Sequence, residues 1–243
     1  MTEPPTFSIA VVCEARADQA TGCALADRML CAQVDWLEGN LEQVRIYRGL
    51  LPVEPHLPWR EVPGLARRRG IRVTGRFTGQ DGHVARQALL LLVAADPRPD
   101  AVLLLRDSDG HLEERTSGLD GARAAQRWPF FVVIGVAHVM RECWVLAGFD
   151  PQDSDEAARL EAVRRQLGFD PRLHAERLTA KHGHDKLSAK RVLAFLCDHV
   201  WDREEACWTS VDVALLAQRG DQTRLRAFLD ELQAHLVPLF TGG

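Results

Sequence analysis

Short apolar runs alternate with longer amphipathic segments along the first 150 residues of the chain. Three of the runs are rich in Val, Ile, Leu and Phe, which predicts strands buried on both faces at 7–13, 101–105 and 130–136. A fourth, shorter strand is expected at 44–47. The segments between these runs carry apolar residues at helical spacing and predict helices at 18–32, from 81 to about 96, and at 119–128.

The chain after residue 150 predicts helices only. The helices are expected at 153–167, 186–197, 202–208, 211–218 and from 221 or 223 to 239. Acidic residues at the start of the helix 153–167 interact favourably with the positive end of its dipole. Strands that alternate with helices favour a mostly parallel sheet covered on both faces, so the fold class is α/β with a helical C-terminal part. We therefore expect an α/β domain at 1–150 and a helical extension at 151–243 that packs on it.

Carboxylates follow three of the predicted strands. Because the carboxyl ends of parallel strands lie at one edge of a sheet, we expect these side chains to converge. Two carboxylates one residue apart repel each other unless a cation lies between them, and Mg²⁺ takes oxygen ligands. A pair of Mg²⁺ or Mn²⁺ ions can hydrolyse a phosphodiester. The alternative at 107–110 is a surface turn, for which Asp, Ser and Gly are ordinary residues. The predicted metal ligands are Glu14, Asp107, Asp109 and Glu142.

Composition limits which binding partners and which cellular compartment are expected. The net charge of -4 gives no general attraction to nucleic acid, so such a partner needs a local basic patch. The candidates for that patch are Arg67, Arg68, Arg69 and Arg76, and a solvated loop is the alternative. The six cysteines lack CxxC spacing and predict reduced, buried thiols. With no apolar run near the roughly 20 residues of a membrane span, we expect a cytoplasmic protein without membrane contact.

Three motifs in this order resemble the Toprim family, which is found in topoisomerases, primases and the overcoming-lysogenization-defect nucleases. Glu14 in VVCEARAD matches the glutamate after the first strand of that family, and Asp107-Ser108-Asp109 matches its Asp-x-Asp. The chain is more closely similar to small stand-alone bacterial Toprim-like proteins, which have a Glu-x-Trp segment and a Lys-rich helix downstream. Here these are Glu142-Cys143-Trp144 and the pair Lys186 and Lys190. The resemblance covers about residues 7–200.

The resemblance implies a metal-dependent nuclease with a Toprim/Rossmann-like sheet. Asp107, Asp109 and Glu142 would hold metal, and Glu14 would hold metal or act as a general base. Either Lys186 or Lys190 would stabilise charge on the phosphate. A further candidate for proton transfer is His138, which shares a helix face with Glu142 if both are helical. Family members act in bacterial antiviral defence, so an ATPase or another defence subunit, or a second copy of the chain, is an expected partner.

Two alternatives remain at this point. A haloacid-dehalogenase-like phosphatase also uses Asp-x-Asp-Gly, with the first Asp as nucleophile, although its motif normally opens the domain. A non-catalytic Toprim-like subunit that binds nucleic acid or a partner is favoured by Ala15, which stands where the family has glycine after the first glutamate.

Overall fold

A computed structural model describes residues 6–75, 79–180 and 182–242 of the 243-residue chain. The chain forms two compact units, and each is described in turn. The first holds the described residues of Met1–Arg106, Glu113–Gly135 and Asp230–Gly243, and the second holds Asp107–Leu112 and Val136–Leu229. The fold is α/β with a mostly parallel sheet, flanking helices and a helical C-terminal region, as the sequence predicts.

A five-stranded sheet forms the framework, and its central strand β1 is fully buried from Ile9 to Cys13. Its main path has the order β2-β1-β4-β5, with β3 also paired to β1. β1 pairs in parallel with three strands, and the register Val12↔Leu104 aligns its carboxyl end with that of β4. The strands are β1 (Phe7–Cys13), β2 (Arg45–Arg48), β3 (Leu57–Pro58), β4 (Ala101–Asp107) and β5 (Phe131–Ala137).

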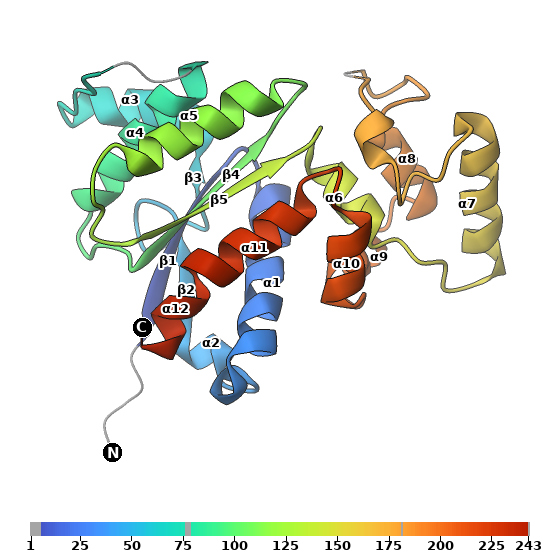
Figure 1. Ribbon diagram of the computed structural model, residues 1–243, viewed down its shortest axis with the longest axis horizontal. Coiled ribbons are helices and arrows are strands. Elements are labelled where there is room, and N and C mark those ends of the chain that lie inside the picture. The colour runs from blue at the N-terminus through green and yellow to red at the C-terminus, as the bar shows by residue number, and fades with distance from the viewer. Residues whose placement is uncertain (1–5, 76–78, 181, 243) are drawn as a thin grey trace. The chain divides into compact units, whose positions relative to one another are not determined.

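Helices cover both faces of this sheet in the first unit: α3, α4 and α5 lie on one side, and α1 lies on the other with α12 against it (Figure 1). The C-terminal residues belong to this unit, since the ring of Phe240 packs edge-on against Phe7 of β1 at 4.6 Å between centroids. Glu231 also accepts hydrogen bonds from Arg123 at 2.6 Å and from the Ile134 N–H at 3.2 Å. The helices are α1 (Arg16–Gln33), η1 (Asp35–Leu37), α2 (Leu41–Val44), η2 (Trp59–Glu61), α3 (Val62–Arg68), α4 (Gly79–Val93), α5 (Leu112–Ala124) and α12 (Val237–Thr241).

The second unit is helical and is built around α6, whose residues are nearly all buried. The indole N–H of Trp144 donates to the carbonyl of Thr223 at 2.7 Å, and its ring stacks on Phe228 with centroids 5.0 Å apart. These contacts anchor α6 to the chain that enters α11. The helices are α6 (Arg141–Ala147), α7 (Ser154–Leu167), η3 (Ala175–Arg177), α8 (Ala189–Leu196), α9 (Trp201–Thr209), α10 (Val213–Arg219) and α11 (Leu225–His235), which continues into the first unit.

Some predicted helix bounds are wrong for identifiable reasons. The helix expected at 119–128 begins at Leu112, because Asp109 and Gly110 take positive φ of 46° and 86° and turn the chain straight after β4. The helix expected from 186 begins at Ala189, because the Ser188 hydroxyl accepts the Arg191 N–H as its N-cap. The segment expected as one helix to 239 is divided between α11 and α12.

Within the described ranges, no helix has both the length and the apolar character needed to cross a membrane.

Candidate functional site

Asp107 is the last residue of β4 and is held by the start of α6. One of its carboxylate oxygens, Oδ1, accepts the backbone N–H of Arg141 at 2.7 Å. Because Arg141 is the first residue of α6, this bond joins the end of the strand to the beginning of the helix. The carboxylate is therefore held in a fixed direction while remaining partly exposed.

The two aspartates are separated by a fully buried serine. The backbone N–H of Ser108 donates to the carbonyls of Ala137 and Val139 at 2.8 and 3.1 Å, and the Asp109 N–H donates to Val139 at 3.0 Å. These bonds fix the loop to the chain that follows β5. The result is a rigid acidic loop in which Asp107 and Asp109 lie on either side of a buried anchor. We call residues 107–110 the DSDG loop.

The imidazole of His138 contacts this loop through Ser108. The serine Oγ lies 3.0 Å from Nδ1 of His138 and also donates to the carbonyl of Val139 at 3.3 Å. Burial lowers the pKa of His138, and the negative charge of Glu176 opposes that shift. A neutral imidazole at pH 7 can accept or donate a proton. His138 is not helical, because α6 begins at Arg141, so His138 and Glu142 do not share a helix face.

Glu142 lies beside a buried arginine that the sequence argument did not single out. The guanidinium of Arg141 is 3.5 Å from the Glu142 carboxylate and 2.6 Å from that of Glu204 in α9. The Arg141 side chain is only 8% exposed, so this pair is largely shielded from solvent. No local pattern could have identified Glu204, because it lies 63 residues further along the chain.

Glu14 belongs to the first unit and joins a network of alternating charges there. Its carboxylate pairs with the guanidinium of Arg106. Arg106 also pairs with Asp81 at 3.3 Å and lies over the ring of Trp59 at 5.3 Å from the centroid. A second arginine, Arg115, contacts the same Asp81 carboxylate at 3.1 Å. The predicted metal ligand Glu14 is therefore neutralised by an arginine in this structure.

The two lysines predicted to contact phosphate are both exposed, one in a turn and the other in a helix. Lys186 lies in the turn before α8, outside the helix in which it was expected, and Lys190 lies on the first turn of α8. Both belong to the second unit, as do Asp107 and Asp109.

The predicted nucleic-acid contacts Arg67, Arg68 and Arg69 are exposed at the end of α3 in the first unit, and Arg76 lies outside the described residues.

No group of three or more His, Cys, Asp or Glu side chains in the described part of the chain is arranged to hold a metal ion. Glu14 and Glu142 instead lie beside arginines, and Asp107 accepts a backbone N–H. The donor set of the DSDG loop still suits Mg²⁺, because this ion keeps several of its waters and binds through only one or two protein carboxylates. Comparison with protein-family models, with curated proteins and with solved structures finds no match to this chain.

Proposed function

We propose that this protein hydrolyses phosphodiester bonds in DNA or RNA with Mg²⁺ or Mn²⁺ as cofactor. The DSDG loop is the observation that supports this most, since it sets two carboxylates one residue apart directly at the carboxyl end of the buried strand β4. Ligands of open parallel sheets bind beyond this edge. A rigid pair of acids there suits a site for a divalent ion more than it suits a solvated turn.

Asp107 and Asp109 would hold the metal, with Glu142 of the same unit as a further ligand. When bound, the ion would activate water and stabilise the charge that develops on the leaving oxygen. The chain's own part is to fix the direction of Asp107 through the Arg141 N–H and to place the neutral imidazole of His138 beside the loop. The ammonium groups of Lys186 and Lys190 are the candidates for contact with phosphate.

A non-catalytic binding subunit is the second candidate. It is favoured by the pairing of Glu14 with Arg106 and by the nearness of Glu142 to Arg141, because an acid neutralised by a guanidinium has less attraction for a metal ion. In that case the protein binds nucleic acid through Arg67, Arg68 and Arg69 without cleaving it.

Cleavage assays on the purified full chain separate the two candidates. Plasmid, single-stranded DNA and RNA are each incubated with Mg²⁺, Mn²⁺ or EDTA, and products are resolved on gels. We expect cleavage that requires the metal and falls by at least about 100-fold in Asp107→Asn, since a metal ligand matters at least as much as the groups that orient it.

Asp120→Asn is the matched control, because Asp120 lies on α5 and its exposed carboxylate pairs with Arg123 one turn along the same helix. It should cleave as the wild type does. Cleavage that survives EDTA, or that Asp107→Asn retains, contradicts the nuclease proposal. Binding of the same substrates without any cleavage supports the second candidate.

A further inference from the structure

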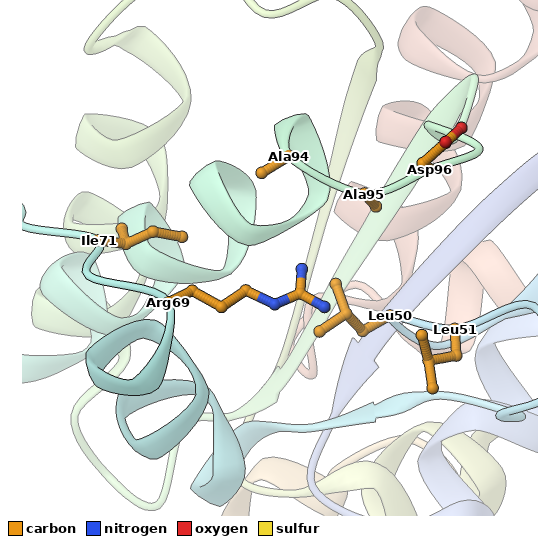
Figure 2. A pocket seen from close by; sticks show the side chains of 7 residues that line it. All are labelled: Leu50, Leu51, Arg69, Ile71, Ala94, Ala95 and Asp96. Atoms are coloured by element: carbon orange, nitrogen blue, oxygen red, sulfur yellow. The ribbon is translucent and has the colours of Figure 1, made fainter.

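The first unit contains a pocket that none of the candidate acids lines (Figure 2). Its volume of about 530 Å³ lies within the range of about 300 to 1,000 Å³ that small-molecule sites occupy. It is open to solvent on one side, and its lining is mostly aliphatic. The lining residues are Leu50, Leu51, Arg69, Ile71, Ala94, Ala95 and Asp96.

Three separate segments build this pocket. Leu50 and Leu51 come from the chain after β2, Arg69 and Ile71 from the end of α3, and the remaining residues from the end of α4. The turn after α3 depends on Gly70, whose φ of +67° is open to glycine at little cost. The Ile71 N–H then bonds back to the Ala66 carbonyl at 2.9 Å, which holds Ile71 in the pocket wall.

A buried arginine joins two of these walls. Arg48 is 1% exposed, and its guanidinium donates to the carbonyl of Leu50 at 3.3 Å and to that of Pro97 at 2.6 Å. The first carbonyl belongs to the chain after β2 and the second to the turn that follows α4. The chain after β2 is fixed again by the Leu51 N–H, which donates to the Glu54 carboxylate at 2.8 Å. The pocket is therefore formed before any ligand arrives, which lowers the entropic cost of binding.

The polar groups of the pocket define what it would bind. The guanidinium of Arg69 extends between the walls toward Leu50 (Figure 2). Within the part of the chain that the structure describes, this guanidinium makes no hydrogen bond or ion pair of its own. Arg67 and Arg68 are exposed immediately before it, so the local field favours a doubly charged anion over a single carboxylate. Asp96 contributes the opposite charge at another part of the lining.

We propose that this pocket binds a nucleoside monophosphate, with Arg69 on the phosphate and the aliphatic walls against the base. Guanidinium groups bind phosphate through two parallel hydrogen bonds. The Asp96 carboxylate points away from Arg69 (Figure 2), so it leaves the guanidinium available to the phosphate. The phosphomonoester comes either from a free nucleotide or from the 5′ end of a nucleic acid strand.

Isothermal titration calorimetry on the full chain tests this inference. The probes are the four nucleoside 5′-monophosphates, the matching nucleosides, ATP and inorganic phosphate. A 5′-phosphorylated oligonucleotide and its 5′-hydroxyl form make up the second arm. We expect at least one monophosphate to bind with a Kd of about 1 mM or tighter, and at least about tenfold more tightly than its nucleoside. Preference for the phosphorylated oligonucleotide over the free nucleotide assigns the pocket to strand ends.

Three variants locate the binding. Arg69→Gln should weaken it by about tenfold or more, because a charge-assisted bond is lost. Ala94→Leu should weaken it by filling the pocket from an exposed position. The matched control Arg60→Gln removes an exposed charge of the same unit that does not line the pocket, and it should weaken binding by less than about threefold.

Absence of binding by every monophosphate, or equal effects of Arg69→Gln and Arg60→Gln, overturns the proposal. Asp107→Asn should bind as the wild type does, so this result is independent of whether the protein is a nuclease.

Discussion

The carboxylate of Glu14 pairs with the guanidinium of Arg106, and Arg106 immediately precedes Asp107 in the chain. The pair continues the alignment of β1 with β4 beyond their last registered residues, Val12 and Leu104. The ends of the two strands are thus joined by charge as well as by backbone hydrogen bonds. Any role of Glu14 as a metal ligand would require this ion pair to loosen.

Replacement of Arg106 by Met should destabilise the fold. The Arg106 side chain is 13% exposed and contacts both Glu14 and Asp81, so its loss leaves the exposed Glu14 and the largely buried Asp81 with fewer partners. We expect the free energy of unfolding to fall by about 1–3 kcal/mol. Urea unfolding followed by tryptophan fluorescence measures the change. Arg226→Met, which removes an exposed ion pair with Asp221, is the control and should change stability by less than about 1 kcal/mol. An equal loss of unfolding free energy in the two variants would show that the ion pairs of Arg106 with Glu14 and Asp81 do not stabilise the fold more than a surface pair does.

Asp170 should make stability depend on pH in the acid range. Burial alone would raise its pKa, but hydrogen bonds from Arg172 and Arg164 outweigh burial and lower the pKa to about 2 from 3.8. A carboxyl group with a lowered folded pKa stabilises the protein above its unfolded pKa, and this stability is lost as the pH falls toward the folded value. The contribution should be about 1–2 kcal/mol after solvent screening, lost between about pH 4 and pH 2.

Urea titrations at several pH values, on the wild type and on Asp170→Asn, measure this dependence. The variant should be less stable near neutral pH and should lose less stability on acidification. Parallel pH profiles for the two proteins would show that Asp170 does not carry the effect.

Only one of the six cysteines should react readily with a thiol reagent in the folded protein. Cys31 is exposed, and the other five are buried with no disulfide among them. Burial raises the pKa of the thiols of Cys13, Cys23 and Cys143, the last to about 12, which keeps them protonated and unreactive. Brief treatment with iodoacetamide followed by mass spectrometry should show one modified site at Cys31, and six after unfolding. Rapid labelling of Cys143 in the folded chain would contradict the packing of α6.

Asp153 should stabilise α7 as its N-cap. Its carboxylate accepts the N–H groups of Asp155 and Glu156 at 2.9 and 2.7 Å, which satisfies two donors that the helix itself cannot. Asp153→Ala should cost about 1 kcal/mol of unfolding free energy, whereas Asp153→Asn, which keeps an accepting oxygen, should cost less. Thermal or urea unfolding measures both. An equally large loss in the Asn variant would show that charge rather than capping is responsible.

Four of the five strands of the sheet were predictable because their signal is local, whereas the two-residue strand β3 was not predicted. The run 7–13 was predicted residue for residue, and Asp153 was correctly expected at the start of α7. The start of α8 was expected at Lys186 but lies at Ala189, because the Ser188 hydroxyl accepts the Arg191 N–H as N-cap. Local sequence patterns therefore predict the presence of a helix or strand more reliably than they predict its first residue.

For the candidate site, the sequence indicates the acidic residues but not the residues that they contact. Glu14, Asp107, Asp109 and Glu142 were singled out as candidates because they follow apolar runs, whereas no pattern in the sequence marks Arg106 or Arg141 as their partners. The pair of Arg141 with Glu204 joins residues far apart in sequence, so only the fold reveals it. The pocket was missed for the same reason, since its lining comes from three segments that share no motif.

The packing of Phe240 against Phe7 has a consequence for how the protein is made. β1 is synthesised long before residues 230–242, which complete the same unit. Until these later residues emerge from the ribosome, Phe7 at the start of β1 lacks its cover and presents apolar surface to other nascent chains. Shortened forms that stop before residue 230 would keep this defect permanently, and they would be prone to aggregate.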